Sequence, residues 1–402
     1  MGEEEIALRK QAIQLLLNGE SKSSIARQLG KSRLWVIRWA TRYRPDDPEG
    51  SLGDRDSAPK KPHCGWPEEV RQMVLRSREA REAGQQPGYK YALIGAEAIH
   101  YELCKLGLAS VPPIRTTHYW LKQAGKVSED KQEEKEEQPS KPYPAPDSQA
   151  VNDLHELDLK GPFYLTGSPQ KYYLVVLRDV CGKRVALAVI LNMQMDTIID
   201  FLLSAWAKMG LPKALQMDNG LVFRGSNRYP RSPGRLARVC LDLGVEPLFI
   251  PTREPWRNGV IESLNGLLDR LFLHRETFTD TAHLHACAAE LETAINTTHR
   301  LSALDGLTPA EFAHSASLRL LPDGYDWRKR NLLLVKGKIS FIRRVRKSGR
   351  ITLCANDKFE IGTEFQYQYV LASVDLEAHR LIVFLQGCLS AHLTTANPLG
   401  VS

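Results

Sequence analysis

The sequence predicts a multidomain protein with α-helical N-terminal modules, an α/β core and a small C-terminal β-barrel. Apolar residues follow helical spacing in the N-terminal part of the chain. After an acidic, proline-rich stretch, strand-like runs alternate with helices, and past residue 310 short strands follow one another closely. The chain has 402 residues, more than one ordinary core accommodates. We therefore expect several folding units.

Residues 1–50 are predicted to form three short helices. "IALRKQAIQLLLNG" and "SKSSIARQLG" each end on a glycine, and "KSRLWVIRWATRYR" begins at Ser32, a capping residue. Leu34, Ile37 and either Ala40 or Thr41 are expected to face inward. The arginines of this helix then remain for phosphates or base edges: Arg33, Arg38, Arg42 and Arg44. The stretch "SSIARQLGKSRLWVIRW" resembles the helix-turn-helix of many transposases and repressors, which implies DNA binding.

Residues 62–125 repeat the helical pattern. "WPEEVRQMVLRSREAREAG" and "YALIGAEAIHYELCKLG" are amphipathic, and "IRTTHYWLKQAG" is a further helix after two prolines. This segment is predicted to be a second helix-turn-helix-like DNA-binding domain, with a purely structural helical domain as the alternative. Residues 126–150 are acidic and proline-rich without an apolar period, so they are predicted to be a linker.

Residues 151–315 are predicted to form the α/β core. "DLHELDLKGPFYL", "KYYLVVLRDV" and "KRVALAVIL" are strand-like runs separated by breaks that contain glycine, as in an antiparallel meander. A helix, the strand "KALQM", a helix, the strand "VEPLFI" and a helix from about Pro255 to His274 follow. The resulting order is βββαβαβα.

One carboxylate stands where a buried strand ends. In "LPKALQMDNGLVF", Asp218 precedes an Asn-Gly pair, and turn formation alone would explain it. Asp158 in the first strand and Glu262 on the last helix are its candidate partners if the first and fourth strands are neighbours. Three clustered carboxylates repel one another unless cations lie between them. Magnesium prefers such hard oxygen ligands, and paired ions catalyse in-line phosphoryl transfer.

The motifs around these acids resemble a known family. "LDLKG", "QMDNGLVF" and "PWRNGVIESLNGLL" are similar to the three blocks of DDE transposases with a retroviral-integrase-type core, as in bacterial insertion sequences. The resemblance implies an RNase H-like core in which Asp158, Asp218 and Glu262 hold two Mg²⁺ or Mn²⁺ ions. Asn219, next to Asp218, is expected to support the site. Asn258 is expected to do the same, because it lies one helical turn before Glu262.

The sequence departs from the family pattern in two places. The stretch between Asp218 and Glu262 is longer than usual, and its extra residues fall in "FRGSNRYPRSPGRLAR". Its arginines are candidate DNA contacts, with a solvated loop as the alternative: Arg228, Arg231 and Arg235. In addition, Asp269 replaces a basic residue that often follows the Glu, with Arg270 next to it.

Residues 325–395 are predicted to form a small DNA-binding β-barrel. The segment 328–350, "RKRNLLLVKGKISFIRRVRKSGR", is rich in Lys and Arg and contains no acid. Its candidate DNA contacts are Arg343, Arg344, Arg346 and Lys347. The expected partners are double-stranded DNA, both transposon ends and target, and further copies of the chain, because joining two ends usually requires a dimer or more.

Composition narrows the class of protein further. No apolar run approaches the ~20 residues of a membrane span, no secretory signal is present, and the seven scattered cysteines are typical of a reducing compartment. We expect a cytoplasmic, nucleoid-associated bacterial protein that does not bind membranes. The predicted activity is cleavage of DNA and joining of 3′-hydroxyl ends to a target. The alternatives are an RNase H-like nuclease without strand transfer, or a catalytically silent DNA-binding regulator.

Overall fold

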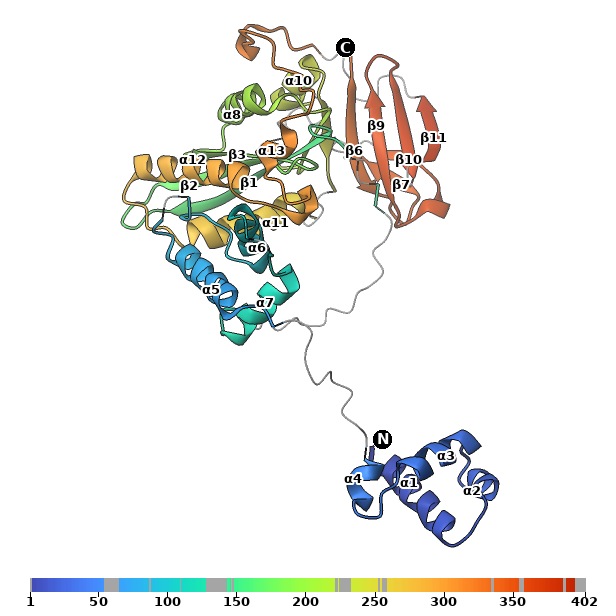
Figure 1. Ribbon diagram of the computed structural model, residues 1–402. Helices are drawn as coiled ribbons and strands as arrows, with labels where there is room; N and C mark the ends of the chain where they lie inside the picture. The colour runs from blue at the N-terminus through green and yellow to red at the C-terminus, as the bar shows by residue number, and fades with distance from the viewer. Residues whose placement is uncertain are drawn as a thin grey trace. The chain divides into compact units, whose positions relative to one another are not determined.

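The computed structural model of the chain divides into two compact units, Met1–Trp66 and Pro67–Ser402 (Figure 1). The structure describes residues 2–53, 65–86, 88–108, 110–127, 143–144, 146, 148–220, 223, 233–251, 254, 259–333, 336–353, 358–385 and 388–394. Within these ranges, no helix combines the length and the apolar character that a bilayer span requires.

The N-terminal unit is helical, as predicted. Its helices are α1 (Gly2–Leu17), α2 (Lys22–Gln28), α3 (Arg33–Arg42) and α4 (Pro48–Leu52). The predicted cap of α3 is confirmed, because Trp35 N donates a hydrogen bond of 3.1 Å to Ser32 Oγ. Ser21 caps α2 in the same way, accepting a hydrogen bond of 3.2 Å from Ser24 N. Both helices therefore begin where the sequence indicates.

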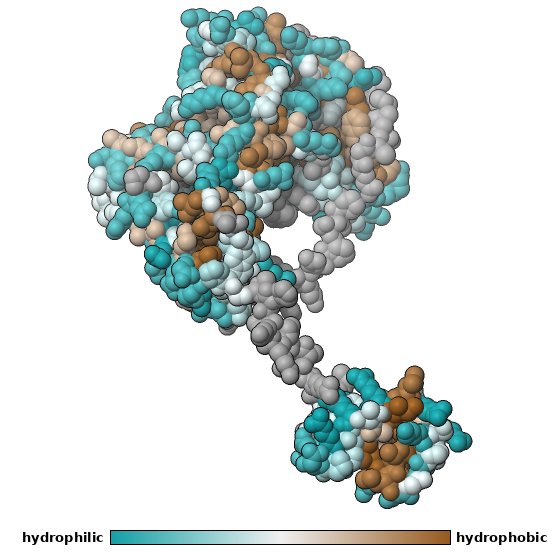
Figure 2. Space-filling view, viewed as in Figure 1, coloured by the Kyte–Doolittle hydropathy of each residue, from teal (hydrophilic) through white to brown (hydrophobic). Residues whose placement is uncertain are grey.

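The core of this unit corrects the predicted orientation of α3. Val36 and Trp39 are the buried residues of α3, and Val36 packs with Ala12 of α1 and Ile25 of α2. Leu34 is 76% exposed, so the prediction that it faces inward was wrong. The two aromatic residues of α3 allowed either face to be read as apolar, and packing against α1 decided between them. Figure 2 shows apolar residues gathered on the visible face of this unit.

A nine-stranded sheet forms the centre of the second unit. Its strands lie in the order β11-β10-β9-β6-β5-β4-β1-β2-β3. The core strands are β1 (Leu154–Tyr164), β2 (Lys171–Asp179), β3 (Val185–Ile190), β4 (Ala214–Met217) and β5 (Glu246–Phe249). Strands β1, β2 and β3 are antiparallel neighbours, which confirms the predicted meander. Strand β4 pairs in parallel with β1, so the first and fourth strands are neighbours, as the candidate site requires.

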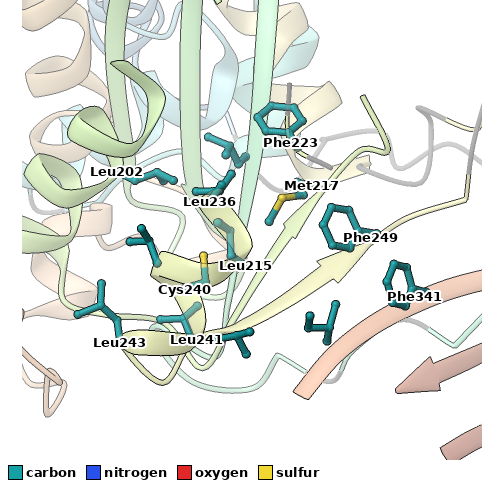
Figure 3. Packing of buried hydrophobic residues seen from close by; sticks show 14 of the residues in the cluster. Leu202, Leu215, Met217, Phe223, Leu236, Cys240, Leu241, Leu243, Phe249 and Phe341 are labelled. Atoms are coloured by element: carbon teal, nitrogen blue, oxygen red, sulfur yellow. The ribbon is translucent and has the colours of Figure 1, made fainter. Parts of the chain in front are cut away.

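Helices cover both faces of this sheet. They are α8 (Met195–Met209), α10 (Arg235–Asp242), α11 (Gly259–Leu268) and α12 (Thr281–Thr297), and the π-helical turn η2 (Asp269–Leu273) extends α11. Leu202 of α8 and Leu236 of α10 pack with Leu215 and Met217 of β4 on one face (Figure 3). Leu264 of α11 belongs to the cluster on the other face, with residues of β2, β3 and α12. Alternation along β4 therefore directs Gln216 and Asp218 towards α11.

Three further helices pack within the same compact unit as the sheet. They are α5 (Glu68–Ala83), α6 (Ala96–Lys105) and α7 (Ile114–Gln123). Between α5 and α6, Tyr91 is 1% exposed, and its ring lies 6.5 Å from that of Phe272. The backbone carbonyl of Tyr91 bonds to Nε2 of His299 at 2.7 Å, and Lys90 pairs with Glu290 at 2.8 Å. Buried and charged contacts thus join this helical segment to the α/β core.

The C-terminal strands continue the core sheet. They are β6 (Lys338–Arg344), β9 (Tyr369–Asp375), β10 (Arg380–Leu385) and β11 (Cys388–Thr394), with a separate pair β7 (Arg350–Thr352) and β8 (Lys358–Glu360). Strand β6 pairs in parallel with β5, and the rings of Phe249 and Phe341 stack at 5.3 Å (Figure 3). Between the described strands the ladder from β11 to β6 is open, so a closed barrel is not confirmed. A series of short strands in the sequence is compatible with a separate barrel and with an extension of the core sheet. The pairing of β6 with β5 shows that these strands extend the core sheet.

Short helical segments complete the second unit. They are η3 (Ser302–Leu304), α13 (Pro309–Ala313), η4 (Trp327–Lys329) and η5 (Thr363–Phe365). Thr308 and Glu311 form a capping box at α13. The Trp327 indole in η4 donates to Asp200 of α8 at 3.0 Å, which fixes the connection between the core helices and β6.

Candidate active site

The parallel pairing of β1 with β4 brings two of the predicted acids to the same level. The last hydrogen-bonded pair in register is Glu156 with Gln216. Two residues further along each strand come Asp158 and Asp218, so the register sets them side by side. Gln216 Nε2 donates to Glu156 Oε1 at 3.2 Å, which shows that side chains at this level point to one face. Asp158 and Asp218 therefore lie next to each other on the face covered by α11.

The environment of Asp218 reflects this neighbour. Burial raises the pKa of the Asp218 carboxyl, and the charge of Asp158 raises it further, against a hydrogen bond from Gly220 N. That bond, 2.7 Å long, goes to Asp218 Oδ1, so the turn interpretation of Asp-Asn-Gly is also correct. A Cβ on Gly220 would lie 2.8 Å from the same oxygen, and glycine makes the close approach possible. The turn fixes the carboxylate at the strand end.

Helix α11 runs along β1 in matching steps. Two residues of a strand span about 6.6 Å and four residues of a helix span about 6 Å, so side chains at these spacings meet in register. Three polar contacts follow this pattern: Ile261 N to Glu156 Oε2 at 2.8 Å, Asn265 Nδ2 to Asp158 Oδ2 at 2.7 Å, and Lys160 Nζ to Asp269 Oδ2 at 2.9 Å. Every second residue of β1 thus contacts the next turn of the helix.

Glu262 lies beside this row of contacts. It is an exposed residue in the first turn of α11, about 100° around the helix from Ile261 and one turn before Asn265. Within the part of the chain that the structure describes, no three Asp, Glu, His or Cys side chains are grouped closely enough to hold a metal ion. The structure thus brings Asp158 and Asp218 together and does not add Glu262 to them.

The two asparagines predicted to support the site have different outcomes. Asn219 donates through Nδ2 to the backbone oxygen of Ile250 after β5, and its Oδ1 accepts from Arg343 Nη2 at 2.8 Å. It therefore ties the ends of β4, β5 and β6 beside Asp218. Asn258 lies outside the described residues, directly before α11.

Arg343 is a structural residue and corrects one of the predicted DNA contacts. It is 8% exposed and donates to backbone oxygens at the end of β5, Phe249 at 3.3 Å and Ile250 at 3.2 Å, and to Thr352 O in β7 at 3.0 Å. A guanidinium with this many buried partners is not available to DNA. Charge patterning could not reveal it, because the basic run looks uniform until the neighbouring strand ends are in place.

Other predicted DNA contacts are distributed unevenly. Arg33, Arg38 and Arg44 are exposed in the N-terminal unit, whereas Arg42 is half-buried and donates to Gly53 O at 2.6 Å. In the second unit the exposed predicted residues are Arg344, Arg346 and Lys347. Arg235 is also exposed, but it pairs with Asp196 and lies over the Trp327 ring. Arg228 and Arg231 lie outside the described residues.

Sequence reasoning missed Glu156 and Arg178. Glu156 is 4% exposed, and burial raises the pKa of its carboxyl to about 7 against the Ile261 N–H and the charge of Arg178. Arg178 stands opposite Glu156 in the β1–β2 ladder, and its Nη1 donates to Val260 O at 3.3 Å. The available signal was the period of two in "HELDLKG", which puts Glu156 and Asp158 on one face of a strand between apolar neighbours.

A family comparison bears on this site. Residues 243–309 match the model of the integrase core domain, a stretch that includes β5, α11 and α12 and therefore Glu262. This part of the chain is therefore similar to an integrase core domain. The matched stretch begins after Asp158 and Asp218, so it does not bear on these two acids. No curated protein matches the chain.

The N-terminal unit has a family match of its own. Residues 7–52 match the model of the ATPase subunit of terminase (gpP-like). This stretch lacks the G-x-x-x-x-G-K-[ST] pattern that cradles ATP phosphates, since Ile25 stands where the first glycine is required. The match covers most of the helical segment α1–α4.

Several solved integrase structures are similar to part of the chain. The catalytic core domain of HTLV-2 integrase in complex with magnesium is 19% identical, with 40% of this chain and 95% of that chain covered and a TM-score of 0.31. The intasome of simian T-cell lymphotropic virus gives 16% identity, 61% and 79% coverage and a TM-score of 0.32. The catalytic core domain of BIV integrase is 19% identical, with 40% of this chain and 92% of that chain covered and a TM-score of 0.29.

Proposed function

We propose that the chain is a DNA transposase that binds element ends, cleaves DNA and joins 3′-hydroxyl ends to target DNA. The observation that carries this proposal is the pairing of Asp158 with Asp218 at the ends of two parallel strands, beneath a helix that belongs to an integrase core. Strand ends of an α/β sheet are where reactive groups from separate segments commonly meet. The cluster is therefore assigned to phosphoryl transfer.

The donor set fits magnesium or manganese. Asp158 and Asp218 are half-buried, and their mutual repulsion is what a hard divalent cation relieves. Two bound ions would activate the attacking oxygen and stabilise the leaving oxygen. Asp158 and Asp218 would hold the ions, Asn265 would fix the orientation of Asp158, and Asn219 would keep the Asp218 turn in place. Glu262, one turn before Asn265, is assigned as the third ligand.

DNA recognition is assigned first to the N-terminal unit. Helices α2 and α3 and the short turn around Gly30 have the order of a helix-turn-helix, with α3 as the recognition helix. Exposed Arg33 and Arg38 on α3 supply phosphate or base contacts. The exposed residues Arg344, Arg346 and Lys347 extend the basic surface at the C-terminal strands. Double-stranded DNA is the proposed partner, bound by a homo-oligomer in a bacterial nucleoid.

A strand-transfer assay tests this function. The full chain is incubated with Mg²⁺, DNA carrying the element ends, and supercoiled target. Cleavage and joining are expected for the wild type and are expected to be lost in Asp158→Asn, Asp218→Asn and Glu262→Gln, with DNA binding retained. Products of hydrolysis without joining would indicate an RNase H-like nuclease. Full activity in any of the three variants would refute the assignment of that residue.

One observation favours a second candidate, a DNA-binding regulator without catalysis. Among the described residues the carboxylates form a pair and not a group of three, as a chain that had lost its chemistry would also show. Mg²⁺-dependent cleavage by the wild type would exclude this candidate. Specific binding of element ends without any cleavage, in Mg²⁺ and in Mn²⁺, would support it.

A further inference from the structure

The buried Glu156 and the half-buried Arg178 both bond to a single peptide group of α11. Glu156 Oε2 accepts from Ile261 N at 2.8 Å, and Arg178 Nη1 donates to Val260 O at 3.3 Å. Val260 O and Ile261 N belong to the same peptide group, so the two side chains bond to its two opposite ends. The residue that follows this peptide is Glu262.

The chemistry of a helix start explains why a carboxylate lies there. Ile261 N is among the first N–H groups of α11, which have no partner inside the helix and carry the positive end of the helix dipole. Glu156 supplies an acceptor for this N–H group from the sheet. Its other oxygen accepts from Gln216 on β4, so the carboxylate cannot rotate freely.

Removing a carboxylate and a guanidinium from water carries a desolvation penalty. Such groups are therefore expected where apolar residues could not make the same contacts. Glu156 is 4% exposed, and its partner stands opposite it on β2. Apolar residues of similar size would pack between sheet and helix at least as well, but they would let α11 slide or rotate. Directional hydrogen bonds to one peptide fix both the height and the rotation of the first turn.

We propose that Glu156 and Arg178 form a clamp that positions Glu262 relative to Asp158 and Asp218. This inference rests on the proposed function and adds two positioning residues to it. The clamp acts at the peptide just before Glu262, and the Asn265 bond to Asp158 holds the next turn. Together they allow α11 to approach the acid pair in one orientation.

Two substitutions separate the clamp from simple packing. Glu156→Leu fills similar space but offers no acceptor to Ile261 N, whereas Glu156→Gln retains an acceptor oxygen. The matched control is Glu246→Leu, because Glu246 is another shielded carboxylate of the sheet that accepts from Ser340 on β6 and lies away from α11 in the strand order. All variants are made in the full chain, and circular dichroism verifies that they are folded.

Hydrogen exchange measured by mass spectrometry tests the clamp without any activity. Loss of one charge-assisted bond should accelerate exchange in the peptide covering 259–268 by about 10- to 100-fold in Glu156→Leu. Glu156→Gln should change it far less, and Glu246→Leu should leave it as in the wild type. Unchanged exchange in Glu156→Leu would overturn the clamp.

Mn²⁺ binding, followed by electron paramagnetic resonance, tests the positioning role. Residues that orient metal ligands typically contribute 10- to 100-fold to metal affinity, so Glu156→Leu should weaken binding by about that factor and Glu156→Gln should restore most of it. Altered exchange with unaltered Mn²⁺ affinity would reduce the clamp to a structural role and overturn the inference. If the wild type neither binds Mn²⁺ nor cleaves, the proposed function fails and the positioning role with it, while exchange still separates the variants.

Discussion

Replacing Asp218 with Asn should stabilise the metal-free protein. Neighbouring strands lie about 4.8 Å apart, so the paired carboxylates of Asp158 and Asp218 are separated by roughly 5 Å. At an effective dielectric constant of about 20, that repulsion is about 3 kcal/mol, and partial exposure reduces it to about 1–2 kcal/mol. Asn retains the acceptor for Gly220 N and removes the charge. The free energy of unfolding in EDTA should therefore rise by about 1–2 kcal/mol.

Magnesium should reverse this order. A ligand at 100 times its Kd stabilises the folded state by about 2.7 kcal/mol, and the wild type should gain this while Asp218→Asn gains little. Urea unfolding at pH 7 with EDTA or Mg²⁺ measures both effects. Asp242→Asn is the control, because Asp242 pairs with Arg330 at 3.0 Å and its replacement removes an attraction. The idea that Asp158 and Asp218 share a cation would be refuted by an Asp218→Asn variant that is less stable than the wild type in EDTA and that Mg²⁺ still stabilises.

Three further outcomes are expected. Arg343→Met should lower the free energy of unfolding by about 2–4 kcal/mol, because it leaves several buried acceptors unpaired, whereas exposed Arg346→Met should change it by less than about 0.5 kcal/mol in the same urea titration. Burial lowers the pKa of His299 to about 4, so the stability that this neutral residue contributes is present above its unfolded pKa of about 6.5 and is lost as pH falls towards 4. The stability difference between wild type and His299→Gln should shift by about 2 kcal/mol between pH 7 and pH 5, and a difference independent of pH would contradict this. Replacing Arg33 and Arg38 together with Gln should weaken binding of all DNA sequences and reduce the slope of log K against log salt by about 2; an unchanged slope would remove α3 from the interface.

The pairing of Asp158 with Asp218 was predictable because local patterns determine it. Three strand-like runs with short breaks indicate a meander, and the helical run before "KALQM" indicates a crossover that returns β4 parallel to the sheet. A carboxylate directly after a buried strand then lies at the sheet's carboxyl edge. The turn residues Asn219 and Gly220 fixed the end of β4 to within a residue.

The position of Glu262 was less predictable because it depends on how α11 rotates about its axis. Ile261, Leu264 and Leu268 face the core, which leaves Asn265 above Asp158 and Glu262 about 60° to its side. Helical spacing in the sequence gives the angle between residues. It does not give the rotation of the whole helix, which the Glu156 and Arg178 contacts set from other strands.

The C-terminal region shows a different limit. Short strands were predicted there, but the sequence of a strand does not specify which neighbour it pairs with. The stacking of Phe249 on Phe341 joins β6 to β5, and Arg343 then finds the carbonyls at the end of β5. The sequence alone is compatible with an exposed Arg343 and with a closed barrel. The pairing of β6 with β5 is what buries Arg343 and joins the C-terminal strands to the core sheet.

The binding of a metal ion between Asp158 and Asp218 is tested most directly by a crystal structure of the full chain soaked in Mn²⁺, with anomalous scattering recorded near the manganese edge. An anomalous peak is expected between the carboxylates of Asp158 and Asp218, with Glu262 drawn within ligand distance of about 2.2 Å. A crystal that takes up Mn²⁺ at other sites and leaves the space between Asp158 and Asp218 without a peak would contradict it.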